Sequence, residues 1–207
     1  DGFQCVIMKV YDIKMVKSSV MLEQAVKHGA PAGTTECTHI FSGSINSNMI
    51  SGSNKGGYAA TVWAVLDCFG CGNLWQDLNG ASIHRLDNVM TMEVTVHQLF
   101  DTLQIYFTAT EVPNRYKLES VHDYTPPFTS SRYVTFLMPD AKKYPLPNPT
   151  YLAIHATCTK IAHLSGAAEH IEEVLRRMED TDVLAEDGGS SEVLYTAILS
   201  LMCAVAV

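Results

Sequence analysis

The sequence lacks any long run of basic residues. Its longest runs are the pairs Lys142-Lys143 and Arg176-Arg177, in a chain of 207 residues with a formal net charge of −8. Nucleic-acid binding without sequence preference relies on lysine and arginine to neutralise phosphates. Strong, non-specific binding to DNA by this chain alone is therefore disfavoured. Most of the acidic excess lies in residues 151–207, where nine acidic side chains face only three basic ones.

The sequence also lacks a long apolar stretch. None reaches the roughly 18 residues that are needed to cross a bilayer, so we expect no membrane span. The longest apolar segment is 193–207, VLYTAILSLMCAVAV. We expect it to form a buried helix, or one through which two copies of the chain pair as a homodimer. Repeats and low-complexity tracts are absent as well, and these features together predict an ordinary globular protein.

A disulfide framework is a third absence. The six cysteines are spread through the chain without a recognisable secretory signal, which is typical of reduced thiols in an intracellular protein, cytoplasmic or nuclear. They stand at positions 5, 37, 68, 71, 158 and 203. Cys68 and Cys71 have the spacing of a metal or redox pair, but no second pair follows at the spacing of a zinc ribbon. We interpret these two thiols as packing residues.

The first part of the chain alternates strand and helix patterns. Residues 1–12 predict a strand, and 17–28 predict a short helix that buries Val20 and Met21 together with Ala25 and Val26. A strand follows at 36–41, and then a loop rich in glycine, serine and asparagine at 41–58. Further on, we expect helices at 61–70, 73–80 and 93–103, and strands at 88–92, 103–111, 116–121 and 132–136.

After residue 148 the pattern is helical throughout. Pro149 opens a helix with one apolar stripe, as proline often does at a first helical position. The stripe consists of Tyr151, Leu152, His155, Cys158 and Ala162. We interpret His155, Cys158 and His163 as packing residues. The predicted fold class is therefore α+β, with a mixed core at 1–150 and a C-terminal helical layer at 151–207 packed on the same domain.

Three polar residues predict a specific chemistry. His39 ends a short strand, Asn88 begins another, and His97 lies on the first turn of the helix that follows. Asp101 stands four residues after His97 and therefore on the same helical face, where an imidazole and a carboxylate can share one cation. Such a pair suits Mg²⁺, Mn²⁺ or Zn²⁺. A histidine fixed at a strand end can accept a proton from water.

Each of these residues also has an ordinary interpretation. A histidine on a strand is usually a surface or core residue, His97 and Asp101 can form a simple helical ion pair, and Asn88 can serve a turn. Nearby Asp77, Asp87 and Glu93 are either additional metal ligands or solvated surface groups. The order and spacing of the whole set favour a functional unit.

The set resembles the HNH family, a hairpin-plus-helix unit that holds one divalent metal against a phosphodiester. Strings over most of residues 1–187 resemble the fungal HNH-nuclease-like domain, among them CTHI, LDNVMTM, VHQLFDTLQIYF and PLPNPTYLAIHATCTKIAHLSG. The resemblance implies an HNH (ββα-metal) core in a metal-dependent endonuclease. It also implies that His39 is the general base, that Asn88 orients it, and that His97 and Asp101 are the metal ligands.

The sequence departs from the family pattern at several positions. Thr38 stands where many active members have a metal-binding residue, and the strings CVIMK and HIFSGS replace a Thr-Gly turn and a His-Ile-Ile-Pro motif. Weakened hydrolytic activity is one expectation. A second hypothesis is a fold recruited as a metal-independent cyclase or pericyclase of fungal biosynthesis. Its apolar small-molecule substrate would lie in a closed pocket beside His39 and Asn88.

Overall fold

The computed structural model describes residues 2–41, 74–78, 80–121, 131–138, 140 and 143–166. The chain forms two compact units, Asp1–Ile40 with Leu86–Thr159 and Phe41–Arg85 with Lys160–Val207. Nearly all of the expected loop at 41–58 lies outside the described residues, as do the expected helix at 61–70, the Cys68–Cys71 pair and the helices after residue 166. The division at residue 150 stays a prediction.

The N-terminal segment turns back on itself, so the long strand expected at 1–12 is wrong. Cys5 donates its backbone N–H to the Val10 carbonyl at 2.9 Å, and Lys9 donates to the Cys5 carbonyl at 3.0 Å. Lys9 has a φ of 57°, in the left-handed region that L-residues rarely adopt. Only β1 (Tyr11–Asp12) is a strand, and it pairs in parallel with β2 (Ala32–Gly33).

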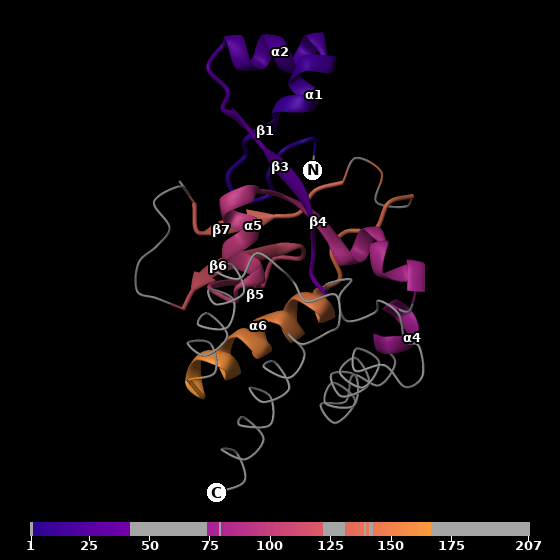
Figure 1. Ribbon diagram of the computed structural model, residues 1–207, viewed down its shortest axis with the longest axis vertical. Coiled ribbons are helices and arrows are strands. Elements are labelled where there is room, and N and C mark those ends of the chain that lie inside the picture. Colours follow the sequence, from indigo (N-terminus) through magenta and orange to yellow (C-terminus); the bar gives the residue numbers. More distant parts are fainter. Residues whose placement is uncertain are drawn as a thin grey trace, which may run out of the picture. The chain divides into compact units, whose positions relative to one another are not determined.

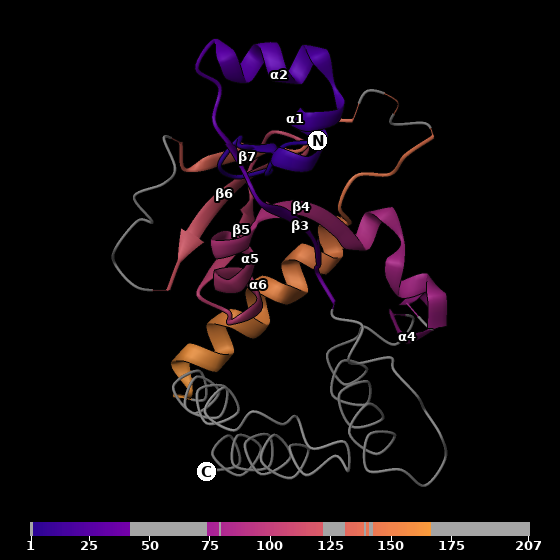
Figure 2. The same ribbon diagram turned by 45° about the horizontal axis from the view of Figure 1, so that its top comes forward.

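Two short helices, α1 (Ile13–Ser18) and α2 (Val20–Lys27), replace the single helix expected at 17–28 (Figure 2). The Asp12 carboxylate caps α1 by accepting the N–H groups of Lys14 and Met15, each at 2.9 Å. The expected apolar face of α2 is wrong, because Leu22 is the residue that turns to the core. Val20 and Met21 point away from it and are 72% and 73% exposed.

The centre of the first unit is a hairpin followed at once by a helix (Figure 1). Strands β3 (Thr35–His39) and β4 (Val89–Glu93) are antiparallel, with His39 opposite Val89. Helix α5 (Val94–Asp101) starts directly after β4, because the Glu93 carboxylate accepts the N–H groups of Thr95 and Val96 and caps it. The predictions for both strands and for this helix are confirmed.

A three-stranded antiparallel sheet follows in the order β5 (Ile105–Ala109), β6 (Arg115–Ser120) and β7 (Tyr133–Thr135). The predicted hairpin around Pro113-Asn114 is confirmed, and Asn114 takes the left-handed conformation that asparagine tolerates in a turn. The buried face of this sheet is aromatic, since Phe107 contacts Phe136 at a ring-centroid distance of 5.5 Å and Tyr116 at 6.3 Å.

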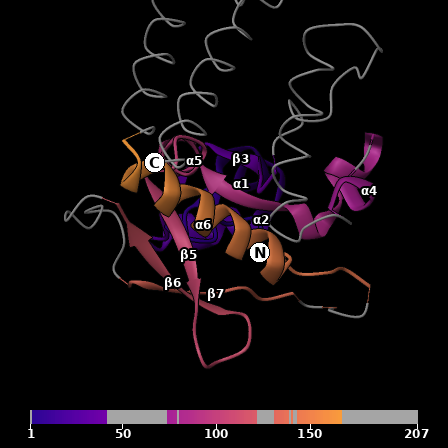
Figure 3. The same ribbon diagram turned by 90° about the horizontal axis from the view of Figure 1, so that it is seen from below.

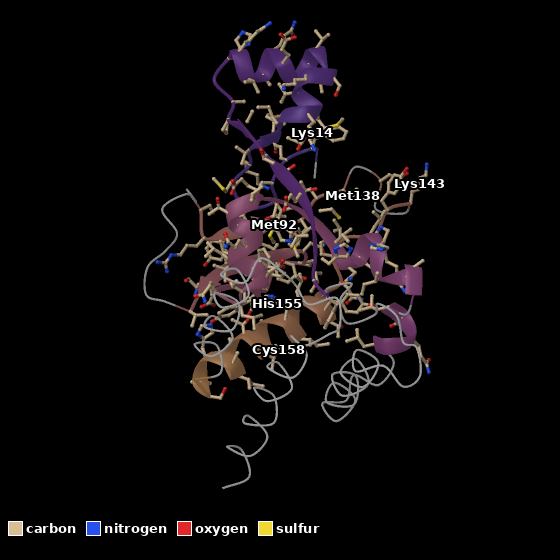
Figure 4. The ribbon with its side chains drawn as sticks, in the orientation of Figure 1. Lys14, Met92, Met138, Lys143, His155 and Cys158 are labelled. Atoms are coloured by element: carbon tan, nitrogen blue, oxygen red, sulfur yellow. The ribbon has the colours of Figure 1, made fainter. Side chains whose placement is uncertain are left out.

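The helix expected after residue 148 is α6 (Pro149–Leu164), which Figure 3 shows from below. Within the first unit, its His155 ring stacks on Phe100 of α5, with centroids 3.8 Å apart and planes within 5°. The expected packing of His155 is confirmed, because this side chain is buried (Figure 4). Cys158 was expected in the same stripe but is exposed, and Thr159 takes the fully buried place instead.

Shorter elements lie between the hairpin strands in the sequence. They are α4 (Leu74–Leu78), which confirms the helix expected at 73–80, and 3₁₀ helices at Gly80–His84 and Leu86–Asn88. The mixture of helices and antiparallel strands confirms the α+β class. Among the described residues, no helix is both long and apolar enough to cross a membrane.

Candidate functional site

The hairpin and α5 bring together most of the residues that the sequence selects. His39 ends β3 and is half-buried, while His97 and Asp101 lie one turn apart on α5. Val96 and Phe100, on the inner face of α5, are almost completely buried and anchor the helix against the hairpin. The two ionisable groups on α5 are therefore carried by a firmly packed helix rather than by a loop.

Asn88 lies just before β4 and is completely buried. Its carbonyl accepts the backbone N–H of Ile40 at 2.9 Å, which continues the hairpin pairing one residue beyond His39. The main chain of Asn88 thus braces the strand end that carries His39. The bracing role expected of its side-chain amide stays a prediction.

His97 lies between two carboxylates. Its Nδ1 atom is 2.8 Å from Oε2 of Glu36 on β3, and its Nε2 atom is 3.1 Å from Oδ2 of Asp101. A neutral imidazole has only one N–H to donate. When Nδ1 donates to Glu36, the Nε2 lone pair faces the Asp101 oxygen, and that approach is favourable only with a proton or a cation between the two atoms.

The electrostatics link Asp101 to both histidines. Burial is the largest cause that raises the pKa of the Asp101 carboxyl above its ordinary value, and Glu36 raises it further, while the charges of His97 and His39 act in the opposite direction. His39 therefore belongs to the same charge cluster as the residues on α5. The Asp101 side chain is still 57% exposed, so a ligand from solvent can reach it.

These donors fit a divalent cation with few protein ligands. Nε2 of His97 and Oδ2 of Asp101 are 3.1 Å apart, and an imidazole with a carboxylate suits Mg²⁺, Mn²⁺ or Zn²⁺. Within the described ranges, no group of three or more histidine, cysteine or acidic residues is arranged to hold a metal ion. Water and substrate oxygens would have to complete the coordination shell.

Glu36 is the site residue that the sequence interpretation missed. A carboxylate that accepts the second ring N–H of a metal-binding histidine fixes the ring's orientation and raises its basicity. Glu36 stands 61 positions before His97, and the contact exists only because β4 leads straight into α5. An acidic residue three positions before His39, on the strand that pairs with β4, was the available signal.

Glu93 and Thr38 are two further polar residues of the hairpin, and the structure describes the surroundings of each. Glu93 was left open between a ligand and a surface group, and its carboxylate is the N-cap of α5. Thr38, directly before His39, is completely buried, and its hydroxyl has no hydrogen-bond partner among the described residues. Among the described residues, Asp101 is the acidic group in contact with Nε2 of His97, at 3.1 Å.

The Glu36→Ala variant should bind Mn²⁺ about 10- to 100-fold more weakly than the wild type, because His97 loses the partner that orients its ring. Glu36→Gln should fall in between, since its amide oxygen still accepts a hydrogen bond but carries no charge. Isothermal titration with Mn²⁺ measures the difference. Glu23→Ala, on exposed helix α2, is the matched control. Equal affinities in all four proteins would contradict the role of Glu36.

A β-hairpin with a histidine at a strand end, followed at once by a helix that carries a histidine–aspartate pair, defines the ββα-metal class of nuclease folds. Consistent with this, the family model of HNH endonucleases matches residues 5–108, about half of the chain, and the protein belongs to this family. The matched region includes β3, β4 and α5. Proteins of this family typically depend on a divalent metal and usually bind nucleic acid. No curated protein and no solved structure matches the chain.

Proposed function

We propose that this protein is a divalent-metal-dependent phosphodiesterase that cleaves nucleic acid. The observation that carries the proposal is the facing pair of His97 Nε2 and Asp101 Oδ2, 3.1 Å apart, with Glu36 holding the other side of the ring. Family membership supports the reaction class. The cluster lies in the first unit, at the edge of the hairpin, where His39 is also carried.

His39 is the general base of the proposed reaction. Its imidazole accepts a proton from a water molecule as the water oxygen attacks phosphorus and the bond to the leaving oxygen breaks. His97 and Asp101 would hold the cation, which when bound supplies Lewis-acid stabilisation of the negative charge on the phosphate oxygens. Asn88 keeps the end of β3 in place through its main chain, so the backbone that carries His39 has a fixed position.

The charge of the chain shapes the expected substrate. Glu36 and Asp101 place negative charge beside the site, so a phosphodiester approaches favourably only when a cation is bound. With a net charge of −8, duplex DNA would be held weakly without a partner that supplies basic surface. We therefore expect slow cleavage of free DNA and a strict requirement for divalent metal.

Cleavage of supercoiled plasmid and of single-stranded DNA by the purified protein tests the proposal. We expect nicking with Mg²⁺ or Mn²⁺ that is abolished by EDTA and by His97→Ala. His97→Ala, purified in the same way, also reports contamination by other nucleases. Nicking that is equal in the wild type and in this variant, or that survives EDTA, would contradict the proposal.

A further inference from the structure

A pocket of about 580 Å³ opens in the first unit, away from the proposed metal ligands. It lies between the N-terminal turn, the β3–β4 hairpin and the segments 135–138 and 145–147. Its volume is within the range of pockets that hold small organic ligands. The proposed metal ligands, His97 and Asp101, are not among the described residues that line it.

The pocket borders the hairpin at Cys37 and at Val89, Met90 and Thr91, whereas the proposed metal ligands lie on α5. Side chains alternate between the two faces of a strand. Cys37 lines the pocket, whereas its neighbour Glu36 turns the other way and contacts His97 on α5. Val89, the cross-strand partner of His39, lines the pocket at the end of the hairpin nearest to that histidine. His97 and Asp101 therefore lie outside the pocket, whereas His39 shares the hairpin face on which Cys37 and Val89 line it.

The lining is largely apolar, with Gln4, Thr91 and Thr135 among its neutral polar residues. Val89, Phe136, Met138 and Leu146 are typical of its wall, and Figure 4 shows Met138 beside the hairpin. Lys9 is the single charged residue among the described lining residues, and no acidic group accompanies it. One cation in an apolar pocket is unusual in a chain with a net charge of −8.

The backbone fixes Lys9 at this place. Its left-handed φ of 57° is a strained conformation for a residue other than glycine, and the bond from its N–H to the Cys5 carbonyl holds the turn. Strained residues that the surrounding structure maintains are concentrated at binding sites. The turn thus places the exposed residue Lys9 in the lining of a largely apolar pocket.

From the volume, the largely apolar wall and Lys9 as the one charged residue among the described lining residues, we propose that this pocket binds a small monoanionic amphiphile. Such a ligand has an unbranched or aromatic apolar body and one acidic head group. The head group pairs with Lys9, and the body packs among Phe136, Met138 and Leu146. The binding mode needs neither a metal nor the His39 imidazole, so it goes beyond the proposed hydrolysis.

Decanoate and the uncharged decanol are suitable probes, titrated into the full-length protein by calorimetry. We expect one decanoate site, with decanol binding about fivefold more weakly and Lys9→Gln losing about the same factor for decanoate, as for a partly exposed ion pair. Lys14→Gln, at an exposed lysine outside the pocket, is the matched control. Equal binding of decanoate and decanol, or no effect of Lys9→Gln, would overturn the proposal.

A second pair of variants keeps the test decisive if Lys9→Gln fails to fold. Leu137 lines the pocket and is 71% exposed, so substitutions there should leave the fold intact. Leu137→Glu places a carboxylate at the rim and should weaken decanoate binding more than the neutral Leu137→Gln does. If the two variants bind decanoate equally, the head group does not lie at this site and the proposal is wrong.

The location is tested independently by chemical modification. Cys37 is an exposed thiol within the pocket, whereas Cys158 is an exposed thiol on α6 outside it. Saturating decanoate should slow the alkylation of Cys37 by iodoacetamide and leave that of Cys158 unchanged, as measured by peptide mass spectrometry. Equal slowing of both thiols, or of neither, would contradict binding in this pocket.

Discussion

The His39→Ala variant is expected to lose about 10²- to 10⁴-fold of the metal-dependent cleavage rate, the usual contribution of a general base. The residues proposed to hold the cation remain in this variant, so its affinity for Mn²⁺ should stay within about twofold of the wild type. A loss of cleavage rate without a loss of Mn²⁺ affinity distinguishes removal of the base from removal of the metal. Plasmid nicking under single-turnover conditions measures the first effect, and calorimetry measures the second.

A histidine outside the site is the control for this experiment. His28 follows α2 as its C-cap, where its Nδ1 atom contacts the Gln24 carbonyl at 2.7 Å, and His28→Ala should cleave at the wild-type rate. Added imidazole should restore part of the activity of His39→Ala and leave His97→Ala inactive. If His39→Ala retains more than about a third of the wild-type rate, His39 is not the base.

The second large effect is loss of stability in acid, caused by His155. This ring is buried against Phe100, where its Nε2–H donates to the Phe100 carbonyl at 3.3 Å, and Nδ1 has no partner in the described part of the chain. Burial lowers the pKa of His155 from 6.5 to about 4. Protonation of the folded protein would bury a charge and a second N–H without an acceptor.

Stability falls in acid because the pKa of His155 is lower in the folded than in the unfolded chain. Above about pH 6.5, His155 is neutral in both the folded and the unfolded chain, and its contribution to stability is fully present. Between pH 6.5 and about 4, the unfolded chain takes up a proton that the folded protein does not, so the free energy of unfolding falls as pH falls. The loss over this window is about 3 kcal/mol.

Urea denaturation at several pH values between 7.5 and 4 measures this loss. His155→Gln removes the titrating group, so this variant should be less stable at neutral pH but should lose about 3 kcal/mol less than the wild type on acidification. His28→Ala should follow the wild type over the same range. Parallel pH profiles for the wild type and His155→Gln would show that another group causes the loss.

Local sequence patterns predicted the hairpin and the helix of the site because local physics forms them. Residues 89–93 alternate in burial, and the four-residue spacing of His97 and Asp101 on α5 is readable directly from the sequence. The pairing of His97 with Asp101 follows from helix geometry alone. These features need no knowledge of how distant segments pack.

Features that depend on tertiary contact were not predictable in the same way. Glu36 reaches His97 only through the register that places it opposite Met92, just before the start of α5. The N-terminal segment has the apolar content of a strand, but the left-handed backbone of Lys9 reverses it and its apolar side chains enter the core. Val20, Met21 and Cys158 were misplaced because a helical stripe shows which residues share a face, not which face meets the core.

The central claim is that His97 and Asp101 bind one divalent cation, and titration of Mn²⁺ followed by electron paramagnetic resonance of the free ion tests it most directly. The wild type should show a single saturable site. Asp101→Asn and His97→Ala should each weaken it by at least about tenfold, whereas Gln98→Ala, at an exposed position on the same helix, should leave it unchanged. The absence of saturable binding in the wild type, or equal affinity in all four proteins, would contradict the claim.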